Sequence, residues 1–339
     1  MPAAGQAGCC WPQTRRKAGL PDLSGIRFAV EGEQGEGWVS PPPESAGFPR
    51  NGLWDWNTAG GNCGRLCTKA GSLKRGASCP PATIRRLKLV GEQIVGRVAI
   101  LGATGTIGST LARRLAAKGA ELILLGRNAE KLAPLAAELN QPWLQVEAHS
   151  AAKLEEGLRP LAESLGGLSA LVNCIGSVLL KPAHSTSDDE FFQVVQTNLM
   201  TAFATVHVAG KLLRENGGSI VLFASAAAEI GMFNHEAIAA AKGGVISLGR
   251  SAASTYANNN IRVNVVSPGL IKTEMTRRLW EIPANAAAST QMHALGRLGE
   301  PGQVASLVDW LLQPENDWIT GQVIGVDGGL GHVLPRKRA

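Results

Sequence analysis

Short apolar segments alternate with longer amphipathic segments from about residue 94 towards the end of the chain. The short segments are typical of buried strands, and the longer ones carry apolar residues at helical spacing. Strands that alternate with helices predict a parallel sheet covered by helices on both faces. We therefore expect one doubly wound α/β domain over residues 94–333. The expected strands are 98–101, 122–125, 143–146, 170–174, 219–223, 262–266 and 323–326, and the expected helices are 109–118, 129–139, 152–165, 188–215, 236–257 and 301–312.

Residues 1–90 lack this periodicity. They contain 9 of the 18 prolines and 14 of the 41 glycines, and such a segment buries too little apolar surface to offset its ordering entropy. We expect most of it to be disordered. Two interpretations remain open: a targeting extension, with an organelle such as the plastid as destination, or a translated upstream region with the true start near Val90 or Val95, which we favour slightly. Without such targeting, the expected location is the cytoplasm.

The net charge of +6 comes entirely from this first segment. Residues 1–90 contain 12 basic and 6 acidic side chains, whereas residues 91–339 contain 21 of each. A neutral main domain argues against a nucleic-acid partner, although residues 334–339 form a short basic tail. No run approaches the length of a membrane-spanning helix, so no membrane partner is expected.

Cysteine is also concentrated in the first segment, and only Cys174 lies in the main domain. A lone apolar cysteine there is typical of a reducing compartment. Cys63 and Cys67 are not followed by a second pair at zinc-binding spacing, so we expect no metal site.

The segment from Val98 to Gly108 is a short apolar run followed by a glycine-rich turn and a helical pattern. A strand, a glycine turn and a helix present backbone N–H groups and a helix N-terminus to a phosphate. The glycines are expected to permit the tight turn, the approach of a pyrophosphate and close helix packing. The sequence therefore predicts a dinucleotide site that includes Gly102, Thr104, Gly105, Thr106, Ile107 and Gly108.

Several further segments resemble the short-chain dehydrogenase/reductase family, in the order and spacing of that family. The resemblance covers about residues 94–331 and implies a Rossmann-type sheet, a nicotinamide coenzyme and a small-molecule substrate. The matching segments are 124–132, 173–176, 197–199, 262–273, 296–301 and 320–329. By the same resemblance, further coenzyme contacts are expected at Asn173, Gly176, Lys242, Pro268, Gly269, Ile271 and Thr273.

The form of the coenzyme depends on the residue that follows the second strand. Dinucleotide folds that prefer NAD place a carboxylate there to bind the ribose 2′-hydroxyl. This chain has Arg127 instead, a planar cation suited to a phosphate, so NADP is expected and NAD is less favoured. The alternative is a solvated arginine at the start of a helix, with Glu130 as an ionic partner.

The chain departs from the family at the expected proton donor. The family pattern is Ser, then Tyr thirteen residues later, then Lys four residues after that, and these offsets give Ser225, Ile238 and Lys242. An isoleucine cannot donate a proton. The only tyrosine, Tyr256, follows eighteen residues after Ile238, about 27 Å along a helix, and is too far away to replace it.

His235 is the candidate substitute, because it lies seven residues before Lys242 on nearly the same helix face. We expect Asn234 to cap that helix and the helix N-terminus to favour neutral His235, which would then act chiefly as a hydrogen-bond donor. By resemblance, Lys242 binds the nicotinamide ribose, Ser225 polarises a substrate carbonyl, and Asn198 holds the lysine through water. The alternatives are a solvated lysine and a histidine that only lines the pocket or caps the helix.

Two functions remain open on this basis. The first is an NADP(H)-dependent oxidoreductase acting on a small, fairly apolar carbonyl or enone, an expectation that rests on the apolar residues around the mouth of the site. The second is a catalytically impaired NADP-binding sensor or scaffold. Members of the family form dimers or tetramers through two long helices, so a homodimer or homotetramer through 188–215 and 236–257 is expected. The apolar residues expected around the mouth of the site are Val178, Leu179, Met232, Phe233, Met275, Leu279 and Trp280.

Overall fold

The computed structural model describes residues 28–32, 35–39 and 96–335. Most of the first 90 residues, with Cys63 and Cys67, and the end of the basic tail lie outside this set, so the expectations for them stay predictions. Within the first segment, strands β1 (Phe28–Gly32) and β2 (Gly35–Val39) pair antiparallel in a two-stranded sheet of their own. In the part of the chain that is described, no helix is long and apolar enough to cross a membrane.

The main domain is built on a seven-stranded parallel sheet in the order β5-β4-β3-β6-β7-β8-β9. All seven predicted strands are present, each with boundaries within two residues of the prediction. The chain runs outward from β3 to β5, then returns to the other side of β3 and continues to β9. The strands are β3 (Arg97–Leu101), β4 (Glu121–Gly126), β5 (Trp143–Gln145), β6 (Ala170–Asn173), β7 (Gly218–Phe223), β8 (Ile261–Pro268) and β9 (Val323–Val326).

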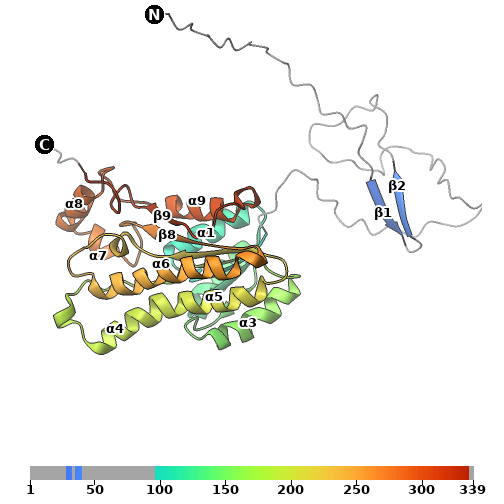
Figure 1. Cartoon of the computed structure of the whole chain (residues 1–339), viewed down its shortest axis with the longest axis horizontal. Helices are drawn as coiled ribbons and strands as arrows, with labels where there is room; N and C mark the ends of the chain where they lie inside the picture. The colour runs from blue at the N-terminus through green and yellow to red at the C-terminus, as the bar shows by residue number, and fades with distance from the viewer. Residues whose placement is uncertain (1–27, 33–34, 40–95, 336–339) are drawn as a thin grey trace, which may run out of the picture. The chain divides into compact units, whose positions relative to one another are not determined.

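Helices cover both faces of this sheet, as predicted. Alternate strand residues point to opposite faces, so Ile100 packs on one face and Leu101 on the other. Figure 1 shows α5 and α6 side by side across one face, with α1 and α9 on the other. The helices of the first face are α3 (Ala151–Ser164), α5 (Thr201–Leu212) and α6 (Glu236–Tyr256), and those of the second are α1 (Thr106–Ala117), α2 (Ala129–Leu139) and α9 (Pro301–Leu312).

The predicted helix 188–215 is wrong in detail. It consists of α4 (Asp188–Val195), a π-helical turn η2 (Gln196–Met200) and α5, and it ends at Leu212. The widened turn coincides with Asn198, whose side chain donates to the carbonyl of Val194 at 2.9 Å. Such π-turns are often found at functional sites.

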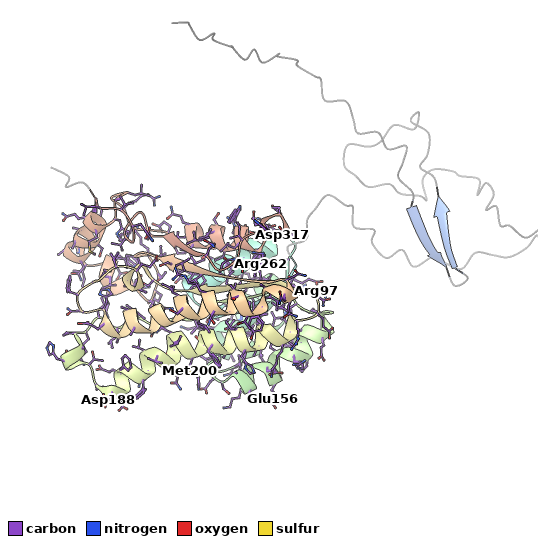
Figure 2. All side chains as sticks on the ribbon, in the orientation of Figure 1. Arg97, Glu156, Asp188, Met200, Arg262 and Asp317 are labelled. Atoms are coloured by element: carbon purple, nitrogen blue, oxygen red, sulfur yellow. The ribbon has the colours of Figure 1, made fainter. Side chains whose placement is uncertain are left out.

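Two helices were not predicted, α7 (Arg277–Trp280) and α8 (Pro283–Met292). They lie between β8 and α9, at the carboxyl end of the sheet. Figure 2 labels Arg97, Arg262 and Asp317 at the opposite, amino end, whereas α7 and α8 lie at the far side of the domain in Figure 1. The two ends of the sheet are therefore distinct surfaces, and the loops expected to bind ligand belong to the carboxyl end.

A buried carboxylate ties the two helices of the second face together. Asp309 of α9 accepts from Arg114 Nε and Lys118 Nζ of α1, both at 2.6 Å, and from Gln313 Nε2 at 2.7 Å. The Asp309 side chain is 2% exposed, but its two cationic partners are over 40% exposed. Burial alone would raise the pKa of the Asp309 carboxyl, but the hydrogen bonds from Lys118 and Arg114 outweigh burial and lower it.

We expect Asp309→Asn to lower the free energy of unfolding by about 2 kcal/mol at neutral pH, less than for a fully buried pair because solvent reaches the two cations. Because the folded-state pKa is lowered, the stabilisation is present above the unfolded pKa and is lost as the pH falls through the folded value. Urea unfolding measures the change. The control is Glu138→Gln, which removes the exposed carboxylate of α2 that pairs with Arg113 of α1; because solvent screens this pair, the change in the free energy of unfolding should be much smaller. Equal effects of the two substitutions would contradict the assignment.

Candidate functional site

The carboxyl ends of the central strands meet beside the point where the strand order reverses, between β3 and β6. In open parallel sheets, ligands bind in the crevice at this position. The loops that start there begin at Gly102, Cys174, Ala224 and Gly269, after β3, β6, β7 and β8 respectively. Among the predicted site residues, Asn173 and Pro268 end β6 and β8, and Arg127 follows β4. The others lie in these loops or in the helices and turns that continue them.

The glycine turn has the geometry that the sequence predicts. Gly102 has a φ of +74°, which favours glycine. A Cβ at Gly108 would lie 2.3 Å from the Gly102 carbonyl oxygen, and one at Gly105 would lie 3.3 Å from the same atom. Helix α1 can therefore pack this close to the turn only because position 108 is glycine.

The start of α1 leaves backbone donors for a ligand. Gly105 is the N-cap, and no side chain caps the helix, so its first N–H groups have no side-chain acceptor within the described residues. A helix N-terminus of this kind suits a pyrophosphate. Thr104 and Ile107 flank it half-buried, and Ile107 packs against the second-face core.

The Thr106 side chain bridges two loops of the site. Thr106 Oγ1 accepts from the backbone N–H of Glu274 at 3.2 Å, which joins the glycine turn to the loop after β8. These residues are 168 positions apart in the chain, so no local pattern predicts this contact.

Arg127 follows β4 directly and is exposed. Helix α2 begins two residues later, capped by the Asn128 side chain. No ion pair involves Arg127 within the described residues, so the alternative pairing with Glu130 is not formed. Arg127 lines a cavity of about 460 Å³ between β5 and α3, which also contains Lys153, Gln145, Glu147 and Glu156.

Two asparagine side chains shape the loop after β6. Asn173 is buried, donates to Thr201 Oγ1 at 3.2 Å and accepts from the N–H of Ile175 at 2.9 Å. Asn198 is 1% exposed; its Oδ1 accepts from the N–H of Ser177 at 3.1 Å, and its Nδ2 donates to Ser177 Oγ at 2.9 Å. Both amides are therefore held by hydrogen bonds within the protein.

Lys242 is a buried ammonium group on α6. It is 6% exposed, and its Nζ donates to the carbonyl oxygen of Phe223, the last residue of β7, at 2.8 Å. A Cβ at Gly176 would lie 3.6 Å from this Nζ and 3.4 Å from Asn198 Oδ1, so the two polar groups flank the same small space. Burial lowers the pKa of Lys242 from 10.5 to about 8. The solvated-lysine alternative is therefore wrong.

Ile238 lies one helical turn before Lys242 and packs with Val194, Ala237 and Ala241 in a small buried cluster. Tyr256 lies at the other end of α6. A Cβ at Gly210 of α5 would be 2.8 Å from the Tyr256 hydroxyl oxygen, which places the phenol against α5. Tyr256 therefore cannot act as the proton donor beside Lys242, as the sequence predicts.

Ser225 and His235 belong to the segment between β7 and α6. Ser225 is half-buried in extended backbone, and its Oγ accepts weakly from the N–H of Ala227 at 3.3 Å, so its own proton is free to donate. His235 Nδ1 lies 2.7 Å from the Phe233 carbonyl oxygen. Because a carbonyl only accepts, this nitrogen carries the proton, and Nε2 of the neutral ring is an acceptor.

The predicted cap of α6 is wrong. Helix α6 begins at Glu236 with His235 as the N-cap, and no side chain caps it. Asn234 has a φ of +61°, in the left-handed region that asparagine tolerates better than most residues. Its side chain therefore does not provide the expected helix cap.

The loop after β8 is held in place by the strand and helix beyond it. The N–H of Gly269 donates to the Val326 carbonyl at 3.2 Å, and the N–H of Leu270 donates to His293 Nε2 at 3.1 Å. His293 is buried, and its Nδ1 lies 2.6 Å from the Ser289 carbonyl. Sequence reasoning missed His293 because Leu270, the loop residue that it binds, lies 23 positions away in the chain. Behind this loop is a cavity of about 500 Å³, lined by residues that include Gly269, Ile271, Arg297 and Asp327.

The remaining predicted residues of this loop have internal roles. Pro268 ends β8, Ile271 is buried and forms a bridge with Gly299, and Thr273 shares a 2.9 Å hydrogen bond with Thr276 Oγ1. Trp280 Nε1 donates to the Thr273 carbonyl at 3.0 Å, which fastens α7 to the loop. The segment between β8 and α8, which borders the site, is therefore held by hydrogen bonds within itself.

A family profile described as "Enoyl-(Acyl carrier protein) reductase" matches residues 102–331. A tropinone reductase homolog from Arabidopsis thaliana is 34% identical over 70% of this chain and 92% of its own length. The 3-oxoacyl-[acyl-carrier-protein] reductase of Mus musculus is 35% identical over 68% of this chain and 96% of its own.

Solved structures show the same relationship. A variant of actinorhodin polyketide ketoreductase with NADPH superimposes with a TM-score of 0.65, at 28% identity, covering 70% of this chain and 98% of its own. A short-chain type dehydrogenase/reductase from Mycobacterium ulcerans superimposes with a TM-score of 0.67, at 27% identity, covering 69% and 89%. The chain therefore belongs to the short-chain dehydrogenase/reductase family, whose members are NAD(P)-dependent oxidoreductases.

Proposed function

We propose that this protein is an NADP(H)-dependent oxidoreductase that transfers a hydride to or from a small, fairly apolar carbonyl or enone. The observation that carries the proposal is the position of Lys242. A buried ammonium group is costly and is retained where it has a partner or a function. Here it lies between the carboxyl ends of β6 and β7, beside the crevice where the coenzyme is expected.

The described residues fit a phosphorylated dinucleotide along this crevice. The uncapped start of α1 would hold the pyrophosphate and Arg127 the 2′-phosphate. Lys242 would bind the nicotinamide ribose, as in the family. The bound coenzyme supplies or accepts the hydride, and the protein orients it and keeps water away. The residues that would border the coenzyme through backbone or side chain are Gly102, Thr104, Gly105, Thr106, Ile107, Gly108, Asn173, Gly176, Pro268, Gly269, Ile271 and Thr273.

We further propose that Ile238 occupies the place of the tyrosine used by the family. The offsets from Ser225 and to Lys242 support this, as does the position of Tyr256 at the far end of α6. A positioned general acid contributes about 10² to 10⁴ in rate, and correct placement of the reactants contributes separately. Loss of the tyrosine therefore slows reduction of a plain carbonyl without abolishing hydride transfer.

The substrate oxygen is proposed to lie near Ser225. Its Oγ makes only a 3.3 Å hydrogen bond as an acceptor, so the hydroxyl proton is free to polarise a carbonyl. His235 lies in the same segment. Its Nδ1 binds the Phe233 carbonyl, and Nε2 is on the other side of the ring. The proposed role of His235 is to accept or donate a hydrogen bond at the substrate, according to its charge.

An apolar substrate is supported by the side chains at the mouth of the site. Phe233 is 84% exposed, and Met275, Ile282 and Leu295 are each at least half exposed. Exposed apolar residues that gather at one place on a surface mark a binding region more often than single ones do. These four come from the segments before α6 and after β8, which border the site.

The alternative is an NADP-binding sensor or scaffold with impaired catalysis, which the missing tyrosine favours. Oxidation of NADPH against a panel of ketones, quinones and enones separates the two functions. Consumption of NADPH with any member of the panel supports the enzyme. Tight NADPH binding without consumption supports the sensor.

We propose that the protein forms a homodimer or homotetramer through α4, α5 and α6. Apolar side chains lie on the outside of α4 and α5; Figure 2 labels Asp188 at the start of α4 and Met200 in the π-helical turn that joins the two helices. Phe203 is 47% exposed and Phe192 is 65% exposed. Small residues of α6, such as Ala240 and Ser247, are also exposed and allow close approach of a second copy.

The cytoplasm remains the predicted location. One relative, a tropinone reductase homolog from Arabidopsis thaliana that is 33% identical over 68% of this chain and 74% of its own length, is described as chloroplastic. This supports a plastid as the alternative if residues 1–90 form a transit peptide.

The coenzyme assignment predicts that Arg127→Gln weakens NADPH binding about 10- to 100-fold, the loss of one charged hydrogen-bonded contact with a phosphate. NADH binding should change less than about twofold, because NADH lacks that phosphate. Calorimetry with both coenzymes measures the change. Arg214→Gln, at an exposed arginine near the opposite end of the sheet, is the matched control. No heat with either coenzyme on the folded parent protein would reject the proposed function.

The interface proposal predicts that Phe203→Glu weakens self-association by about 2 kcal/mol or more, since it places a carboxylate in a desolvated aromatic contact. Sedimentation equilibrium over a dilution series measures this. Phe233→Glu makes the same change at a more exposed phenylalanine outside these helices and should leave the mass unchanged. If the Phe203 variant keeps the parent's mass at every concentration, the interface lies elsewhere.

A further inference from the structure

Lys242 is surrounded by neutral groups. The loop after β6 contributes Gly176, the π-turn contributes the Asn198 amide, and β7 contributes the Phe223 carbonyl. The thiol nearest along the β6 loop, that of Cys174, stays neutral because burial raises its pKa to about 12. No ion pair of the described residues involves Lys242. Its ammonium therefore donates one hydrogen bond to Phe223 and has two further protons that no described group accepts.

The other groups at the site are poor sources of a proton. Ile238 has none to give, and Tyr256 packs against Gly210 on α5. Neutral His235 has its single N–H on the nitrogen that faces the Phe233 carbonyl. The ammonium of Lys181, in the neighbouring loop, is bound to both carboxylate oxygens of Glu190.

From this arrangement we propose that the Lys242 ammonium donates the proton to the substrate oxygen, in place of the missing phenol. This rests on the proposed function and assigns its proton source. In the reducing direction, a hydride would leave a C–H bond of the reduced coenzyme, which is thereby oxidised, and form the new C–H bond at the carbonyl carbon. The electron pair of the C=O π bond goes to oxygen, which takes a proton from Nζ. Lys242 becomes a neutral amine, and solvent returns the proton after the product leaves.

The environment of the ammonium suits this role. A general acid works best when its pKa lies near the working pH, and burial brings the pKa of Lys242 to about 8. The carbonyl of Phe223 holds the nitrogen in place whether or not the proton has left. The rate of carbonyl reduction should consequently fall as the pH rises through about 8, because the amine that remains has no proton to give.

The first test compares two independent titrations. The first titration uses NMR of protein with isotope-labelled lysine side chains. The Lys242 signal is assigned by its absence from the Lys242→Arg spectrum, and its pH dependence gives the midpoint of the Lys242 titration without turnover. The pH dependence of single-turnover NADPH oxidation with phenanthrenequinone gives the midpoint of the reaction. We expect both midpoints near pH 8. A rate that is unchanged across the Lys242 titration, or that falls at a different pH, overturns the proposal.

The second test uses Lys242→Arg. Arginine keeps the positive charge for the ribose but does not release its proton in this pH range. Calorimetric NADPH affinity should stay within about threefold, whereas the single-turnover rate should fall about 10² to 10⁴ fold. Lys211→Arg makes the same substitution at an exposed lysine of α5 and should change neither quantity.

The outcomes separate the two proposals. A Lys242→Arg protein that binds NADPH and reduces the quinone at the parental rate overturns the proton-donor role and leaves the oxidoreductase standing. A parent protein that does not bind NADPH, or never oxidises it, overturns both. If arginine does not fit the buried position, shown by loss of the folded NMR spectrum, Lys242→Met with added methylamine replaces it. Rescue of its rate by the amine supports the role, and failure of rescue in folded protein overturns it.

Discussion

Both faces of the parallel sheet must be buried, and this constraint decides where the chemistry lies. Each central strand has apolar side chains on both faces, covered by α1, α2 and α9 on one side and α3, α5 and α6 on the other. Parallel strands need such cover because their connections pass over the faces. Most polar groups consequently lie at the two ends of the strands, where the loops are. At the carboxyl edge, the glycine turn, the Asn173 loop, Ser225 and the loop after β8 come together because of this arrangement.

Lys242 is buried without an ionic partner among the described residues, unlike Asp309, and its burial is costly. A pKa lowered from 10.5 to about 8 corresponds to about 3 kcal/mol of stability lost at neutral pH, since each unit is worth about 1.4 kcal/mol. The sign follows from linkage: the folded state releases the proton more readily than the unfolded state, so stability falls as the pH decreases from the unfolded to the folded pKa. The single contact with Phe223 does not offset this loss. Such a cost is expected of a group kept for function rather than for folding.

Hydrophobic periodicity and glycine spacing predicted the sheet, most helices and the glycine turn, because these features depend on neighbours in the chain. Helix 129–139 agrees with the structure at both ends, since Asn128 and Asn140 cap it through local geometry. Helix α8 was not predicted because it buries none of its residues and so has no apolar face. The contact of Asn198 in the π-turn with Ser177 and the contact of His293 with Leu270 join residues 21 and 23 positions apart, and no periodicity encodes them.

Those remote contacts also explain how the site keeps its shape. Asn173, Asn198 and His293 use their side chains to bind backbone groups of the loops beside them. Each is buried, where an unmade hydrogen bond is costly, so the loops are fixed by satisfied polar groups. The hydroxyl of Ser225 and the ammonium of Lys242 differ, because each retains protons that no described group accepts. The side chains that hold the loops are thus bound within the protein, and Ser225 and Lys242 provide the spare donors on which the proposed chemistry depends.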